Sequence, residues 1–154
     1  MYSVWLTNEQ QRVWRRYLAM VSQLQGAMHR QLQQDCELSL ADYDVLVALS
    51  ERGPMRIGEL GEALAWEQSR LSHQLRRMRG RGLIDRHGRD DDRRSAIVEI
   101  TDGGRQAIAT AAPGHVELVR STVFDGLSPT QLAAFGSVVD TVLERLATSP
   151  SRRT

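Results

Sequence analysis

The stretch of sequence that decides the fold of this chain is QSRLSHQLRRMR, residues 68–79. Its apolar residues, Leu71, Leu75 and Met78, are spaced by four and then three positions, the spacing of one face of an α-helix. The other positions are mostly polar and rich in arginine. The pattern predicts a helix that packs one face against a core and exposes the other.

A shorter helix is predicted just before it, over residues 57–64. Ile57, Leu60 and Leu64 give this segment an apolar face, and only a few residues separate it from the arginine-rich helix. Two helices joined this tightly are typical of a helix-turn-helix, in which the first helix braces the second in the major groove of DNA. We therefore interpret residues 68–79 as a DNA-reading helix.

The residues of this helix suit different contacts with DNA. Arg70 and His73 are the best candidates for reading base edges, because an arginine fork fits the edge of guanine. The remaining candidates suit phosphate, bridging water or salt bridges: Gln68, Ser69, Ser72, Arg76 and Arg77. For any one arginine, a solvated surface charge is the alternative.

After the reading helix the sequence changes to period two. We predict two short strands, residues 84–87 and 96–100, joined by the charged segment 88–95. A strand pair in this place forms a wing. Arg94 can enter the minor groove, where the potential is strongly negative, and Asp92 can orient it through a bidentate pair. Arg93 is a second candidate DNA contact of the wing. A solvated turn of mixed charge is the alternative.

The charge distribution agrees with a DNA-binding surface in this part of the chain. The 154 residues carry a net charge of only +1. Residues 70–94 alone hold nine arginines and four acidic residues, so the rest of the chain is slightly acidic. A basic block in a nearly neutral protein indicates a site for a polyanion.

Long helices are predicted on both sides of this region. Thr7 caps the first, which carries an apolar seam at heptad-like spacing, and Ser39 caps the second. Thr101 caps a long helix in which Pro113 predicts a kink or break near residue 112, and Ser128 caps the last. The seam favours a subunit interface, although packing within one chain would also explain it.

Several short motifs together resemble the MarR family of bacterial regulators, and the resemblance covers nearly the whole chain. They are Ile57–Leu64, the run Ser69-Arg70-Leu71-Ser72-His73-Gln74-Leu75, Gly82-Leu83-Ile84, Asp92-Arg93-Arg94, and Val98-Glu99-Ile100-Thr101. The resemblance implies a mainly α fold with a small β-hairpin wing: a winged helix-turn-helix lobe plus a helical dimerisation region. It also implies a homodimer that represses transcription from a palindromic double-stranded operator. A small aromatic or anionic effector would release the DNA.

With that resemblance, we divide the chain into four parts. Residues 1–36 form an N-terminal dimerisation helix and residues 37–102 the winged DNA-binding lobe. Residues 103–147 form the C-terminal dimerisation helices, and residues 148–154 a flexible tail. An effector pocket could be lined by Trp14, Tyr17, His29 and Tyr43, although such residues more often belong to a core or a seam.

The remaining expectations concern other functions. Cys36 could make the chain a redox sensor, but its acidic neighbours favour an inert thiol. The histidines lack metal-ligand spacing and no catalytic motif is present, so we expect no metal, no cofactor and no enzyme. No apolar run could span a membrane, and a single cysteine fits a cytoplasmic protein. A winged helix that contacts only proteins, without DNA binding, is the other alternative.

Overall fold

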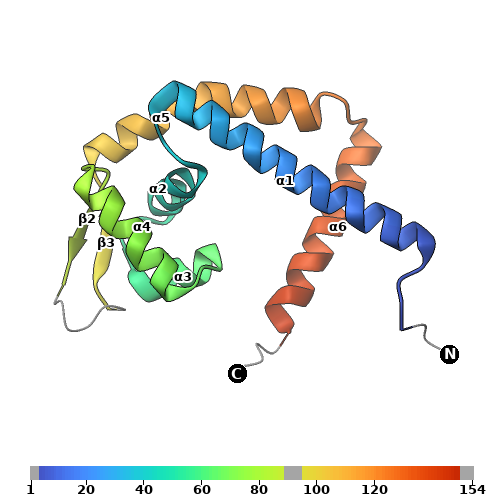
Figure 1. Cartoon of the computed structure of the whole chain (residues 1–154), viewed down its shortest axis with the longest axis horizontal. Coiled ribbons are helices and arrows are strands. Elements are labelled where there is room, and N and C mark those ends of the chain that lie inside the picture. The colour runs from blue at the N-terminus through green and yellow to red at the C-terminus, as the bar shows by residue number, and fades with distance from the viewer. Residues whose placement is uncertain (1–3, 89–94, 150–154) are drawn as a thin grey trace. The chain divides into compact units, whose positions relative to one another are not determined.

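The structure, a computed structural model, describes residues 4–88 and 95–149, and Figure 1 shows the order of its elements. The helices are α1 (Asn8–Cys36), α2 (Leu40–Arg52), α3 (Ile57–Leu64), α4 (Gln68–Gly80), α5 (Asp102–Val119) and α6 (Pro129–Thr148), and a π-helical turn, η1 (Arg120–Phe124), continues α5. The strands are β1 (Met55–Arg56), β2 (Ile84–His87) and β3 (Ile97–Ile100). The predicted mainly helical fold with a small sheet is confirmed.

The predicted helix starts are confirmed by their hydrogen bonds. Three helices begin with a capping box, in which a hydroxyl side chain and the third helical residue each accept a bond from the other's backbone N–H: Thr7 with Gln10, Ser39 with Asp42, and Ser128 with Gln131. At the start of α5, the Thr101 hydroxyl accepts a bond from the backbone N–H of Gly104 at 3.0 Å. The polar residues before each apolar stretch therefore set where these helices begin.

Two details differ from the sequence-based predictions. We predicted a kink or a break near residue 112, and no break occurs there: α5 continues through Pro113 as far as Val119. Proline removes one backbone donor, but Pro113 is exposed and the neighbouring Ala111 is fully buried, so packing holds the helix together. The sheet also has a third strand, β1, which pairs antiparallel with β3 and gives the order β1-β3-β2.

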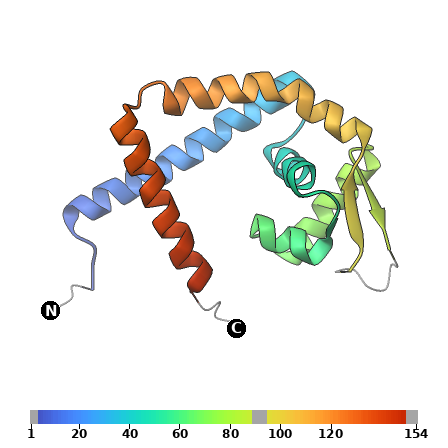
Figure 2. The ribbon, with the colours of Figure 1, turned by 180° about the vertical axis from the view of Figure 1, so that it is seen from behind.

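The chain divides into two compact units, residues 1–115 and 116–154. In the first unit α2 is central, because α1, α3, α4 and β3 all contact it (Figure 1, Figure 2). Its buried Leu46 and Leu49 join a core that includes Leu60 of α3, Leu71 of α4 and Val98 of β3. In the second unit, α6 buries none of its residues within a single chain.

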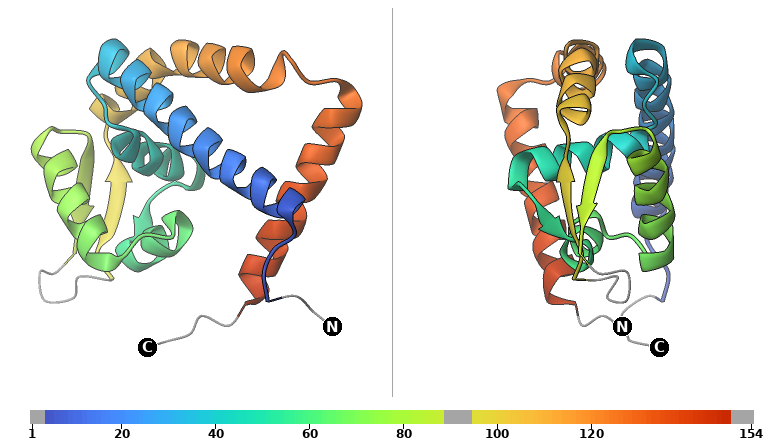
Figure 3. Two further views of the ribbon diagram at one scale, coloured as in Figure 1. Left: turned by 45° about the vertical axis from the view of Figure 1, so that its right-hand side comes forward. Right: turned by 90° about the vertical axis from the view of Figure 1, so that its left-hand side faces the viewer.

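The turn between α3 and α4 is short and well defined. Ala65 ends α3 in the left-handed conformation, with φ of 54°. The backbone N–H of Trp66 then donates to the carbonyl of Gly61 at 3.0 Å. The left-handed residue and this hydrogen bond close the turn, and α4 then packs against α2 and β2. Figure 3 shows β2 and β3 side by side, with α4 next to them.

Candidate DNA-binding surface

Helix α4 has one buried stripe and three exposed regions around it. The buried stripe consists of Leu71, Gln74, Leu75 and Met78. At 3.6 residues per turn, Ser69, His73 and Arg76 lie opposite this stripe, and all three are exposed. Two flanks lie between the outer face and the stripe, one toward α2 and one toward the strands. The predicted DNA-reading residues are thus divided among three surfaces of one helix.

On the flank toward α2, Arg70 stacks on Trp66. Its guanidinium carbon lies 4.2 Å from the centroid of the indole ring, within the range of a cation–π interaction. Partial burial raises the pKa of the nearby Asp44 carboxyl, while the charges of Arg70 and His115 lower it. Arg70 is therefore held against an aromatic ring, and its position at the start of α4 is restricted.

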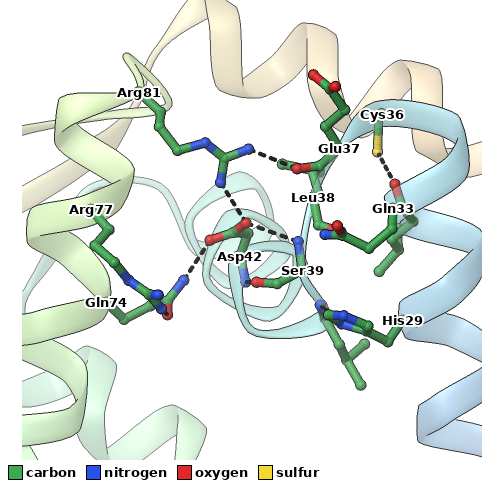
Figure 4. Close-up of polar contacts among 12 residues, drawn as sticks. His29, Gln33, Cys36, Glu37, Leu38, Ser39, Asp42, Gln74, Arg77 and Arg81 are labelled. Atoms are coloured by element: carbon green, nitrogen blue, oxygen red, sulfur yellow. Dashed lines mark hydrogen bonds and ion pairs between the residues drawn. The ribbon is translucent and has the colours of Figure 1, made fainter.

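Further along the same flank, Arg77 contacts a polar group in the core. One Nη atom of Arg77 donates to Gln74 Oε1 at 2.7 Å, and the Gln74 amide in turn donates to Asp42 of α2 (Figure 4). Sequence reasoning did not assign a role to Gln74. The sequence did contain a signal for such a role, because a glutamine in an apolar helical stripe needs a buried hydrogen-bond partner.

On the flank toward the strands lies a cavity of about 250 Å³. Ser72, Arg76 and Arg79 of α4 line one side of it, and Arg86 of β2 lines the other. The Nε and one Nη atom of Arg86 are buried and have no hydrogen-bond partner among the described residues. Buried guanidinium nitrogens without a hydrogen-bond partner are costly, so this cavity favours an anionic group such as a phosphate.

Arg79 and Arg86 were not among the predicted DNA contacts. The period-two pattern of β2 could have indicated Arg86, because it shares the inward face with Ile84, which is buried. Gln68 and Ser72 are half-buried, and Gln68 Nε2 has no hydrogen-bond partner within the described part of the chain. The predicted wing residues Asp92, Arg93 and Arg94 lie outside the described residues.

The outer face of the wing strands carries three possible metal ligands. Asp85, His87 and Glu99 place their donor atoms within 4.8 Å of one another. His87 Nε2 lies 2.6 Å from Glu99 Oε1, and Asp85 and His87 are exposed. A direct contact between imidazole and carboxylate accounts for this arrangement, so we assign no metal to it.

The four predicted effector-pocket residues lie at different points along α1 and α2. Trp14 and Tyr17 stack on each other along α1, with ring centroids 5.5 Å apart. His29 lies twelve residues beyond Tyr17, about 18 Å along a helix, and its Nδ1 accepts a bond from the backbone of Leu40. Tyr43 packs against the ring of His115 at 4.8 Å. Within a single chain, the pair Trp14 and Tyr17 is therefore distant from His29.

Cys36 is half-buried at the end of α1. Its thiol donates to the carbonyl of Leu32, with sulfur and oxygen 3.2 Å apart. Burial is the largest influence on this group and raises the pKa of the thiol, and the charge of Asp35 adds to the increase. A raised pKa lowers the thiolate fraction at neutral pH, and the thiolate is the form that reacts with oxidants.

A braced helix with exposed arginines on its outer face and both flanks, beside a small sheet, defines a winged helix-turn-helix DNA-binding protein. A model of the MarR family matches residues 38–96. The chain is 38% identical to Sco3205, a MarR family transcriptional regulator from Streptomyces coelicolor whose crystal structure was solved in complex with DNA. The TM-score is 0.85, with 96% of each chain covered. The chain belongs to the MarR family.

Two further relatives agree with this assignment. AbsC, a MarR family transcriptional regulator from Streptomyces coelicolor, is 32% identical, with a TM-score of 0.84 over 96% of this chain and 100% of that one. The transcriptional repressor NicR of Pseudomonas putida is 30% identical over 56% of this chain and 55% of that protein. The chain is thus a transcriptional regulator, as the sequence predicted, and not an enzyme. Among the described residues, no helix is long and apolar enough to cross a membrane.

Proposed function

We propose that this regulator is a homodimeric repressor that binds a palindromic operator. The observation that carries the proposal is the outer face of α4, where Ser69, His73 and Arg76 are exposed between two flanks that also carry arginine. A helix braced in this way can enter the major groove, and two copies would engage half-sites about 34–36 Å apart. The name of NicR supports repression as the outcome.

In this proposal the contacts are divided by surface. Arg70 and His73 read base edges, while Gln68, Ser69 and Ser72 contact phosphate or bridging water. Arg76 contacts phosphate together with Arg86, whose Nε and one Nη atom are buried without a hydrogen-bond partner among the described residues. From the wing, Arg94 reaches the minor groove with Asp92 orienting it, and Arg93 contacts the backbone.

The dimer in this proposal uses residues 1–36 and 103–147. Apolar side chains are exposed along α1, including Trp14 at 51% and Tyr17 at 45%, and a longer row lies along α6. Exposed apolar rows of this length usually mark a protein interface. A small aromatic or anionic effector would lower operator affinity by favouring a spacing of the two lobes that does not match the operator.

The test is a selection from random duplex DNA followed by footprinting and binding at several salt concentrations. The expected result is enrichment of a palindrome. With six to ten phosphate contacts, affinity should fall by about 10³ to 10⁵ between 50 and 200 mM salt. Arg70→Ala should relax preference at one operator position, whereas Arg94→Ala should weaken binding to all sequences.

Absence of an enriched sequence and of salt dependence would instead support a winged module that contacts only proteins. Effector release is tested separately, by titrating benzoate and related aromatic acids into the complex of the protein with a labelled operator. A rise in the dissociation constant with any of these acids supports the proposed release. No change across the series contradicts an aromatic acid as the effector class.

A further inference from the structure

Gln74 is a polar residue on the packed face of the reading helix. It is only 4% exposed, and the other residues of its stripe, Leu71, Leu75 and Met78, are apolar. Asp42 of α2, which faces it, is also 4% exposed. Burying an amide and a carboxylate is costly unless both are hydrogen-bonded, so each of the two side chains needs partners.

The bonds form a continuous series, drawn in Figure 4. Asp42 Oδ2 accepts from the backbone N–H of Ser39 at 2.9 Å and from Nη1 of Arg81 at 2.7 Å. Arg81 also donates to the carbonyl of Glu37, the residue that caps α1, at 2.8 Å. Asp42 Oδ1 accepts from Gln74 Nε2 at 2.5 Å, and Gln74 Oε1 accepts from Arg77 at 2.7 Å.

The direction of the Gln74 amide follows from its neighbours. An ionised carboxylate only accepts hydrogen bonds, so the amide must turn its NH₂ group toward Asp42. Its carbonyl oxygen then faces the other way, toward the guanidinium of Arg77. A flipped amide would place oxygen against oxygen at Asp42 and an NH₂ group against a cation at Arg77. Asp42 therefore determines which atom Arg77 meets.

We propose that Gln74 and Asp42 are positioning residues for DNA binding, which hold the Arg77 guanidinium ready for a phosphate. Arg77 is exposed, and the bond to Gln74 uses one Nη atom of a group with five N–H donors. The proposal rests on the proposed DNA-binding function. Ordering a free arginine on binding would cost affinity, so holding it in advance should improve the dissociation constant about threefold to tenfold.

A purely structural role predicts something different. If the series only fastened α2 to α4, loss of Gln74 would weaken the fold or shift the whole helix. Every DNA contact of α4 would then change, that of Arg76 included. If Gln74 acts through Arg77, its loss should matter only while Arg77 is present. Arg76 is the matched control, because it is also an exposed arginine of α4 and has a different set of neighbours.

The experiment is a pair of double-mutant cycles on operator binding by the full chain. Gln74→Met keeps the length of the side chain and removes both hydrogen bonds. Combined with Arg77→Ala, it should weaken binding no further than Arg77→Ala alone, within about twofold. In the Arg76→Ala background, Gln74→Met should raise the dissociation constant by the same factor as it does in the wild type. Arg77→Ala should also reduce the slope of log affinity against log salt by about one.

The proposal would be overturned if Gln74→Met weakened operator binding by the same factor in the Arg77→Ala and Arg76→Ala backgrounds. If Gln74→Met does not fold, the wild-type chain provides the test through NMR of its arginine side chains. Rotation about the Nε–Cζ bond should be slower in Arg77 than in Arg76, and equal rates would overturn the proposal. If Arg77→Ala binds the operator as tightly as the wild type, only this inference is rejected. If the wild-type chain shows no specific binding, the proposed function is rejected.

Discussion

Trp66 and Arg70 form the residue pair with the most direct consequence for reading DNA. The stack at 4.2 Å restricts the guanidinium before DNA arrives. Trp66→Leu should raise the dissociation constant for the operator about twofold to tenfold, because a cation–π contact contributes roughly 0.5–1 kcal/mol at an exposed site and more when desolvated. Fluorescence anisotropy with operator and random duplexes measures this, and Trp66→Phe should lose less.

Trp66 also packs against the core, so the loss must be traced to Arg70. The control is the same substitution in an Arg70→Ala background, where it should leave operator affinity unchanged. Urea unfolding of each variant reports any general loss of stability. A full additional loss of affinity in the Arg70→Ala background would contradict the assigned role of Trp66.

Cys36 provides a second test at the residue scale, on the redox-sensing alternative. Burial raises the pKa of its thiol, so at pH 7.5 the thiolate fraction is smaller than in free cysteine. Alkylation by iodoacetamide should therefore be slower than that of free cysteine and should accelerate as the pH rises toward the raised pKa. Operator binding by the wild type and by Cys36→Ala should respond equally to low peroxide. Faster alkylation than free cysteine would revive the redox-sensing hypothesis.

At the scale of elements, Gly104 allows the start of α5 to lie close to the sheet. A Cβ atom there would overlap the carbonyl oxygen of Leu83 and lie 2.7 Å from Cγ1 of Ile100. Gly104→Ala should therefore destabilise the fold by about 1–3 kcal/mol, the usual cost of overpacking. Urea unfolding measures the change.

Gly80→Ala is the matched control for this substitution. Gly80 ends α4, its Cβ would meet nothing within 4 Å, and it does not need a positive φ. This change should be neutral or slightly stabilising, since alanine favours a helix over glycine. Unfolding of both variants at the same urea concentration would contradict the close approach of Gly104 to Leu83 and Ile100.

The elements that the sequence predicted well are those whose signals are local. The bounds of α3 and the capping residues of four helices depend on a few neighbouring side chains, and the structure confirms them. Strand β1 has only two residues, too few to show a period, and it forms because β3 lies beside it. Pro113 does not break α5. The burial of Ala111, two residues before it, depends on tertiary packing that a local sequence pattern does not show.

The residues of the candidate site also fall into those that a local sequence pattern predicts and those that it does not. The exposed residues of α4 follow from helical periodicity. The role of Gln74 depends on a partner 32 residues away in the chain. The role of Arg86 depends on the cavity that it lines and on two guanidinium nitrogens that have no hydrogen-bond partner in the described part of the chain. Spacing along a sequence does not reveal such contacts, and only folded geometry brings them together.

At the scale of the whole molecule, the exposed apolar row of α6 requires an explanation. Its members recur at spacings of three and four, and their exposed fractions range from 38% to 65%: Leu132, Phe135, Val138, Val139, Val142, Leu143 and Leu146. Helix α6 is amphipathic and buries no residue within its own chain. A second copy of the chain would cover the row, and in a two-fold dimer each residue of the row would occur twice in the interface.

Val142→Asp should therefore shift the chain from dimer to monomer at micromolar concentration, because it places two carboxylates in an apolar interface. Sedimentation velocity measures the shift. Affinity for a palindromic operator should fall steeply, since two linked lobes bind far more tightly than separate ones, while weak binding to a single half-site should persist. Ser137→Asp is the control, because Ser137 is exposed on the opposite side of α6 by helical spacing. That variant should remain a dimer, and a wild-type chain that sediments as a monomer would refute the proposed assembly.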